Sequence, residues 1–139
     1  MESYAAEALR LASGFGVSLN YSESSLQDLE ALLAQLYQEL PRLSSSTAGT
    51  NDPGQQQIDA AARVWGGYFG ETIRRLWGGE WGVETYPGTA AAVISVDIGG
   101  AKLFPVMKVY RRLTQGEAEN VWNFYQKVRE KVPKGGNRQ

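Results

Sequence analysis

Glu71 is the ionisable residue whose neighbours are best placed to give it a chemical role. Arg74 and Arg75 follow it by three and four positions, which is the spacing of ion pairs along one side of a helix. On a solvated surface such a pair only supports its helix. In a cleft, with Arg111 or Arg112 crossing over the carboxylate, the same group could orient a ligand. The sequence leaves both readings open.

Two tryptophans flank a pair of glycines directly after this segment. Trp77 precedes Gly78-Gly79 and Trp81 follows it, so at least one indole is expected to be partly exposed at the turn. Exposed Trp and Arg side chains are favoured contact residues in protein interfaces. The candidate binding residues are therefore the ionisable and aromatic side chains around this turn and the later arginine pair: Tyr68, Glu71, Arg74, Trp77, Trp81, Arg111 and Arg112.

The 139 residues include no cysteine and no histidine. Disulfides, thiolate or imidazole metal sites, cysteine nucleophiles and a Ser-His-Asp arrangement are thereby excluded. The usual general base at neutral pH is also missing. We therefore assign no catalytic residue, expect no metal and no cofactor, and consider an enzyme the less favoured class.

Charge is unevenly divided along the chain. Residues 1–60 hold eight acidic and two basic residues, a net −6, whereas residues 61–139 hold seven acidic and twelve basic residues, a net +5. Either the two halves pack together and compensate, or the second half presents a basic face to an acidic partner. Nucleic acid is not expected, because the bases are scattered and the sequence pI is about 5.5.

Apolar periodicity predicts two helices before residue 60. The first covers residues 3–12. The second begins near Ser22 and carries leucines at helical spacing until Pro41, which is expected to end it. This leucine stripe is interpreted as a core face, with a dimer seam as the alternative. Residues 42–56 are too polar to pack and predict a flexible internal loop.

The third predicted helix spans residues 55–77 and contains glycines at 66, 67 and 70. Gly66 and Gly70 fall beside its apolar face, so another element can approach closely there, whereas Gly67 is placed toward the polar side with Glu71. This helix is expected near the centre of the fold.

The remaining chain predicts a sheet followed by helices. Strands are expected at 80–86, 90–97 and 102–104, and the segment at Val17 is a candidate for a fourth. Pro105 starts a helix, and Thr114 with Glu117 forms a capping box for the last one. The fold class is thus α+β: an antiparallel three- to four-stranded meander packed by N-terminal helices, a central glycine-containing helix and C-terminal helices. Residues 1–132 form a single domain, and 133–139 a disordered tail.

Several short motifs resemble a group of small bacterial proteins of unknown function. These share a Gly-Tyr-x-Gly-Glu helix, here Gly67–Glu71, and a Gly-Gly-x-Trp entry into a strand, here Gly78–Trp81. Tyr21–Leu26 and the Arg-Arg-Leu before Thr114 are similar to the same pattern, and the likeness covers most of residues 20–130. The resemblance implies an α+β fold and a bacterial, cytoplasmic setting. It implies no activity.

Two functions remain as hypotheses. The first is a non-enzymatic protein-binding or adaptor protein, of the immunity or accessory type. The second is a small-ligand-binding or carboxylate-based enzymatic domain with a cleft around Glu71. The longest apolar runs, such as Ala90–Ser95, are far shorter than the roughly 20 residues needed to cross a bilayer, so no membrane role is expected. A homodimer through the leucine helix or a sheet edge is a further expectation.

Overall fold

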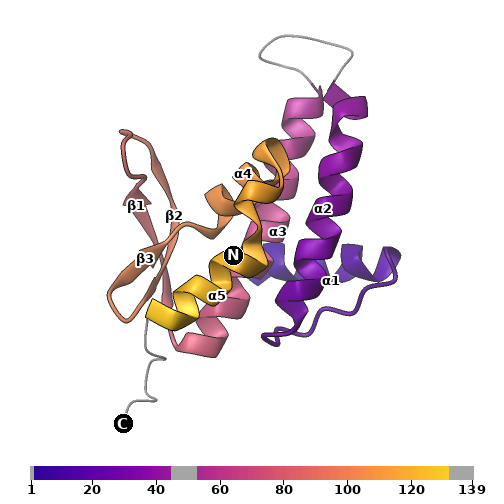
Figure 1. Cartoon of the computed structure of the whole chain (residues 1–139). Helices are drawn as coiled ribbons and strands as arrows, with labels where there is room; N and C mark the ends of the chain where they lie inside the picture. Colours follow the sequence, from indigo (N-terminus) through magenta and orange to yellow (C-terminus); the bar gives the residue numbers. More distant parts are fainter. Residues whose placement is uncertain (1, 45–52, 132–139) are drawn as a thin grey trace.

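The computed structural model describes residues 2–44 and 53–131. Helices come first, a small sheet follows, and the chain returns to helices (Figure 1). The elements in chain order are α1 (Glu2–Gly14), α2 (Ser25–Ser44), α3 (Pro53–Trp77), β1 (Glu80–Thr85), β2 (Ala92–Ile98), β3 (Ala101–Leu103), α4 (Pro105–Gln115), the 3-10 turn η1 (Glu117–Glu119) and α5 (Val121–Lys131).

The sheet is an antiparallel meander in the order β1-β2-β3. Glu80 to Thr85 pair with Asp97 to Ala92, and Val96 to Ile98 pair with Leu103 to Ala101. The α+β prediction is confirmed. The fourth strand at Val17 was wrong: this segment has no strand structure, because Leu19 is buried among the helices and the N–H of Tyr21 is bonded to the Tyr68 hydroxyl.

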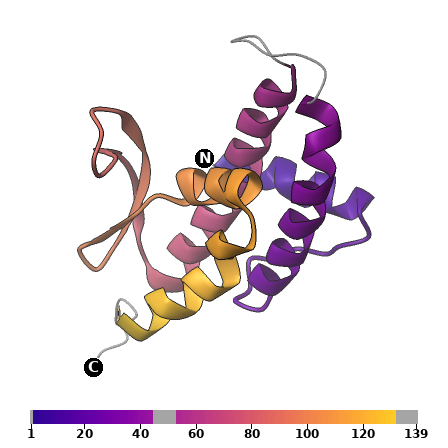
Figure 2. The same ribbon diagram turned by 45° about the horizontal axis from the view of Figure 1, so that its top comes forward.

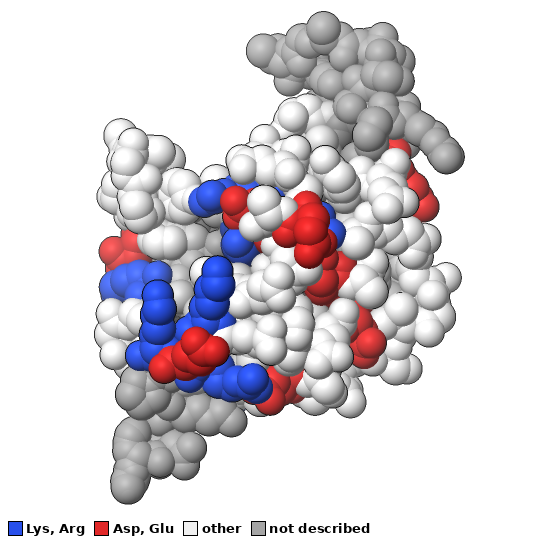
Figure 3. All heavy atoms as spheres, in the orientation of Figure 1, with Lys and Arg blue, Asp and Glu red and all other residues white. Residues whose placement is uncertain are grey.

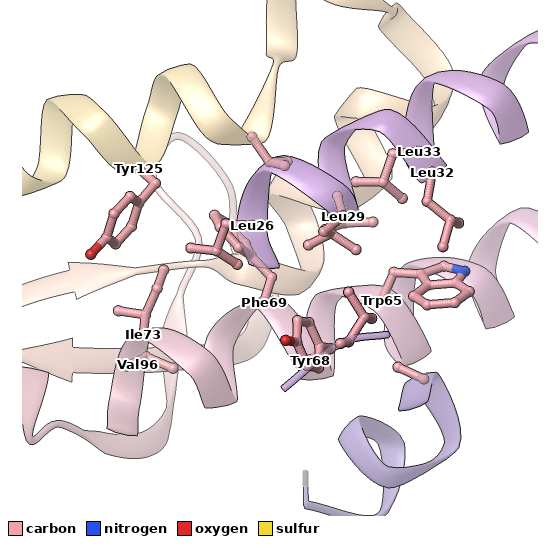
Figure 4. Packing of buried hydrophobic residues seen from close by; sticks show 14 of the residues in the cluster. Leu26, Leu29, Leu32, Leu33, Trp65, Tyr68, Phe69, Ile73, Val96 and Tyr125 are labelled. Atoms are coloured by element: carbon pink, nitrogen blue, oxygen red, sulfur yellow. The ribbon is translucent and has the colours of Figure 1, made fainter. Parts of the chain in front are cut away.

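α3 is the central element, as the sequence predicted. It lies with α4 between the sheet and the helices α1 and α2, an arrangement visible in Figures 1 and 2. The leucine stripe of α2 packs onto α3 through four buried leucines and forms a core face there, as the sequence predicted (Figure 4): Leu26, Leu29, Leu32 and Leu33. Aromatic side chains of α3 fill the space between them. The labelled core residues are Leu26, Leu29, Leu32, Leu33, Trp65, Tyr68, Phe69, Ile73, Val96 and Tyr125.

The glycines of α3 allow close approach. A Cβ on Gly66 would lie 2.6 Å from the Cα of Val106, and one on Gly70 would collide with the indole of Trp81. The polar side assigned to Gly67 and Glu71 was wrong, since both are buried. Residues 65–73 of α3 are all buried, so this part of the helix has no polar, solvent-facing side.

Two helix ends also differ from the prediction. α2 continues through Pro41 to Ser44: a proline lacks the N–H of one ladder bond and crowds the carbonyl four residues earlier, which can kink a helix without ending it. The predicted loop therefore shrinks: residues 42–44 belong to α2 and 53–56 to α3. The rest of the predicted loop, 45–52, and the predicted tail, 133–139, lie outside the described residues.

The capping box at Thr114 was wrong. Thr114 donates its hydroxyl to the Tyr110 carbonyl inside α4, and Gly116, with φ of 95°, separates α4 from η1. Asn120 caps α5 instead, its side-chain oxygen accepting a hydrogen bond from the Asn123 N–H at 2.9 Å.

Candidate functional site

Glu71 is fully buried at the junction of α3 and β1. Its carboxylate accepts hydrogen bonds from Arg74 Nε at 2.9 Å and Arg74 Nη2 at 2.6 Å. Arg75 Nε and Trp81 Nε1 each donate at 2.8 Å. The side chain has no exposed surface, while Arg74 is about one-third exposed and Arg75 about half. The carboxylate therefore has four donors directed at its two oxygens.

These donors decide the charge state of Glu71. The hydrogen bond from Arg74, helped by those from Arg75 and Trp81, lowers the pKa of the carboxyl from 4.5 to about 2, against the opposing effect of burial. A carboxylate in this state is a weak proton acceptor. The hydrogen bond that Glu71 accepts from Trp81 instead joins the start of β1 to α3.

The two later arginines do not cross over Glu71, contrary to the cleft reading. Arg112 is buried and pairs with Glu30 of α2, with Nη2 2.8 Å from the carboxylate. Arg111 is turned the other way, donating to Glu119 and to the Tyr86 hydroxyl, each at 3.0 Å. Neither arginine therefore takes the place over Glu71 that the sequence suggested.

Tyr68 and Trp77 are also interior residues. The Tyr68 hydroxyl accepts the Tyr21 N–H at 2.8 Å and shares a hydrogen bond with Ser25 Oγ at 2.6 Å, so it joins α3 to the start of α2. Trp77 donates to the Tyr125 hydroxyl at 3.3 Å, joining α3 to α5. Of the seven candidates, Glu71, Arg74 and Trp81 form one cluster. Tyr68, Trp77, Arg111 and Arg112 each lie elsewhere.

A groove lies between β3, α4 and α5, away from Glu71. Its volume is about 520 Å³, and we call it the basic groove. Three cationic side chains, one acid and three aromatic rings line it. The lining residues are Tyr86, Pro87, Lys102, Leu103, Phe104, Lys108, Arg111, Glu119 and Phe124.

A single carboxylate holds two of these cations. Glu119 bonds Lys108 Nζ at 2.8 Å and Arg111 Nη2 at 3.0 Å, and the hydrogen bond from Lys108 is the main cause of its lowered pKa. Lys108 Nζ also lies 5.0 Å from the centre of the Phe124 ring. On the opposite wall the third cation, Lys102, pairs with Asp97 at 2.8 Å.

The basic surface continues along α5. Lys127 and Lys131 are three and seven positions after Phe124, and so lie on the same side of the helix as this groove residue. Both side chains are exposed and make no ion pair with any residue in the described ranges. Figure 3 shows Lys and Arg atoms gathered where the end of α5 meets β3.

A second groove, of about 420 Å³, lies by the β1–β2 hairpin and is mostly apolar. We call it the apolar groove. The exposed fraction of Val83 in this groove is 62%, the highest among the large apolar residues of the described chain. Its lining residues are Tyr4, Arg63, Val83, Ala92, Val93, Ile94, Val106 and Met107.

Sequence reasoning missed the groove residues Lys102, Lys108 and Phe124. The one signal that pointed toward them was the +5 charge of residues 61–139. That count cannot show which bases share a surface, since β3, α4 and α5 meet only in the folded chain.

The fold and these surfaces define an α+β protein in which a helical body packs against a small meander, with Val96 and Ile98 of β2 contributing to the core. Comparison with family models, curated proteins and solved structures found no match. Within the described ranges, no helix has the length and apolar character required to traverse a lipid bilayer.

Proposed function

We propose that this protein is a non-enzymatic binding protein that recognises an acidic segment of another protein at the basic groove. The observation that carries the proposal is the lining of that groove, in which three cations and three aromatic rings surround one carboxylate. An adaptor or immunity role is the kind of function that such a surface suits.

Charge supports an acidic partner. Lys127 and Lys131 extend the groove on one side with two cations that have no ionic partner among the described residues. An approaching carboxylate-rich segment is attracted by this surface before contact, which raises the association rate at low ionic strength.

The aromatic rings support a protein segment over a bare anion. Tyr86 and Phe104 meet edge to face with ring centres 5.2 Å apart, and Phe124 forms the opposite side of the groove. Half-buried rings of this kind take up apolar side chains, and aromatic residues with arginine are the usual strong contacts of an interface. A segment carrying both carboxylates and an apolar residue fits this combination.

The cleft around Glu71 has less support. Its carboxylate is enclosed, has four donors and lines neither the basic groove nor the apolar groove. A ligand would have to displace Arg74 or Trp81 to reach it.

Binding of a synthetic peptide tests the proposal. The probe is a fluorescein-labelled peptide of glutamates with one central tryptophan, compared with the same peptide carrying glutamines, by fluorescence anisotropy. We expect the acidic peptide to bind more tightly, with an affinity that falls as NaCl rises from about 50 to about 300 mM. The paired change Lys127→Glu and Lys131→Glu should weaken binding by about tenfold.

The matched control is the paired change Arg10→Glu and Arg63→Glu. It alters the net charge by the same amount on exposed positions outside the basic groove, and it should leave the affinity nearly unchanged. Equal loss in both pairs, equal binding of the glutamine peptide, or tighter binding of a single-stranded oligonucleotide would each contradict recognition of an acidic protein segment.

A further inference from the structure

The outer edge of β1 is open for strand pairing. β1 is the first strand of the sheet and pairs with β2 only. Tyr86 N–H bonds the Ala91 carbonyl, and because ladder bonds alternate along an antiparallel strand, residues 80, 82 and 84 also face β2. The N–H and C=O groups of Trp81, Val83 and Thr85 therefore point outward, with no strand beside them in the described part of the chain.

This edge has part of the usual protection against pairing. Natural edge strands are shielded by charged side chains, prolines, bulges or a covering element, and of these β1 carries the charges of Glu80 and Glu84. β1 has no proline, and its register with β2 is continuous over six pairs without a bulge. The Val83 side chain at its centre is largely exposed, and the turn end of the hairpin extends beyond α4 in Figures 1 and 2.

We propose that β1 pairs antiparallel with β1 of a second copy of this chain, about a two-fold axis through Val83. Val83 then lies opposite Val83 of the second copy, and Trp81 lies opposite Thr85. The outward N–H and C=O groups of residues 81, 83 and 85 thus face the same groups of the second copy and can form hydrogen bonds with them, as the alternation along antiparallel strands requires. The two three-stranded sheets become one continuous sheet, through an isologous contact that closes on itself.

The charges of β1 select this register. With the axis at Gly82, Glu80 would lie directly opposite Glu84 of the second copy, and with the axis at Glu84 that residue would face itself. Like charges directly opposite each other are unfavourable. With the axis at Val83, Glu84 lies opposite Gly82, and Glu80 lies opposite Tyr86. The central register therefore has full strand overlap with no acidic pair.

Apolar surface favours a second copy as the occupant. Val83 and Ile94 are paired neighbours on the same face, and both line the apolar groove. In the proposed dimer the two Val83 side chains touch across the axis, so the apolar grooves of the two copies become continuous. Contact removes the Val83 side chain, which is 62% exposed in the single chain, from water. The dimer depends on the β1 edge and the apolar groove, which shares no lining residue with the basic groove, so it does not rest on the proposed function.

Proline at position 83 tests the dimer. The Val83 N–H points away from β2, so Val83→Pro keeps the hairpin hydrogen bonds and removes two bonds across the axis. Sedimentation velocity over a concentration series should show a dimer for the parent chain and a monomer for Val83→Pro. Val83→Thr keeps both the N–H and the β-branch, and it should remain dimeric.

Cysteine pairing tests the register and does not depend on the proline variant folding. The chain has no cysteine, so each introduced thiol reports alone. Val83→Cys should oxidise to a covalent dimer, since directly opposite strand residues lie within disulfide range. Gly82→Cys and Glu84→Cys should cross-link when mixed and not singly. A Cβ at Gly82 would meet only Ser95 Oγ at 3.5 Å, so this site accepts the change.

Three results would overturn the proposal. One is a parent chain that stays monomeric at all concentrations, which would leave the edge to a strand from another protein. Another is a Val83→Pro variant that is folded and still dimeric. The third is cross-linking of Gly82→Cys or Glu84→Cys alone while Val83→Cys stays reduced and monomeric. Loss of acidic-peptide binding would bear only on the basic groove.

Discussion

Glu71 is a buried carboxylate with four hydrogen-bond donors, so a change in its hydrogen-bonding pattern should lower the stability of the fold. Glu71→Gln replaces one acceptor oxygen by an amide that must face Arg74, Arg75 or the Trp81 N–H. The arginines lose their counter-charge, and one donor meets another donor. We expect the free energy of unfolding to fall by about 2–4 kcal/mol. Urea unfolding at pH 7, followed by tryptophan fluorescence, measures this loss.

The pH dependence of the stability of Glu71→Gln shows how much of the loss comes from the charge of Glu71. Because the folded pKa of Glu71 is lowered from 4.5 to about 2, its contribution is complete above pH 4.5 and is lost as the pH falls toward 2. The stability difference between parent and Glu71→Gln should therefore narrow across that window. Glu7→Gln, which removes an exposed pair with Arg10, should change nothing measurable. A Glu71→Gln variant as stable as the parent at pH 7 would contradict this account.

Residue types were predictable from the sequence, but their partners were not. The spacing of Glu71, Arg74 and Arg75 correctly indicated an ion pair within one helix. It did not indicate burial, because Trp81 covers the carboxylate from another element. Arg111 and Arg112 differ by about 100° around α4, so Arg112 points into the core and Arg111 into the basic groove. Only the packing of α4 decides which of the two arginines is buried.

At the scale of elements, the glycines of α3 set its distance from α4. Gly66→Ala places a methyl group 2.6 Å from the Cα of Val106, where backbone has to move. The gain in helix propensity of about 1 kcal/mol is smaller than this cost. We expect a net destabilisation of about 1–3 kcal/mol in thermal or urea unfolding. Gly14→Ala in α1, which meets nothing within 4 Å, is the matched control and should be neutral or stabilising.

Periodicity predicted the elements better than their ends. The five helices and three strands of the described chain all fall on segments that the apolar pattern indicated, apart from the turn η1. Errors arose at Pro41, Thr114 and Val17, where local signals competed with packing. Leu19 shows the reason: an apolar residue after a helix fits a strand or a core loop equally well, and burial against helices decided the outcome.

A Gly66→Ala variant that is more stable than the parent would show that the backbone of α4 moves away from α3 at little cost. It would contradict the conclusion that the glycines of α3 set its distance from α4.

For the whole molecule, the opposite charges of the two halves meet in specific pairs. Glu30 of α2 bonds Arg112 of α4 and also accepts the Val121 N–H at 2.9 Å, so one carboxylate joins α2, α4 and the start of α5. Glu23 pairs with Arg129 at 3.0 Å at the other end of α5. Compensation between the halves therefore accounts for part of the charge division. Lys127 and Lys131, which make no ion pair with any residue in the described ranges, carry positive charge that it does not compensate.

The Glu30–Arg112 pair should couple the halves measurably. Arg112→Met leaves Glu30 in the core with the Val121 N–H but without its counter-ion, and we expect a loss of about 3–5 kcal/mol in the free energy of unfolding. Glu30→Gln should cost less, since the amide oxygen still accepts. With both changes the buried carboxylate is gone, so the double variant should be more stable than the sum of single losses predicts, by about 2 kcal/mol. Urea unfolding of all four chains gives this coupling energy. The same set of variants at the exposed Glu7–Arg10 pair should show no coupling energy. Additive losses at Glu30 and Arg112 would mean that the two halves are joined by apolar packing alone.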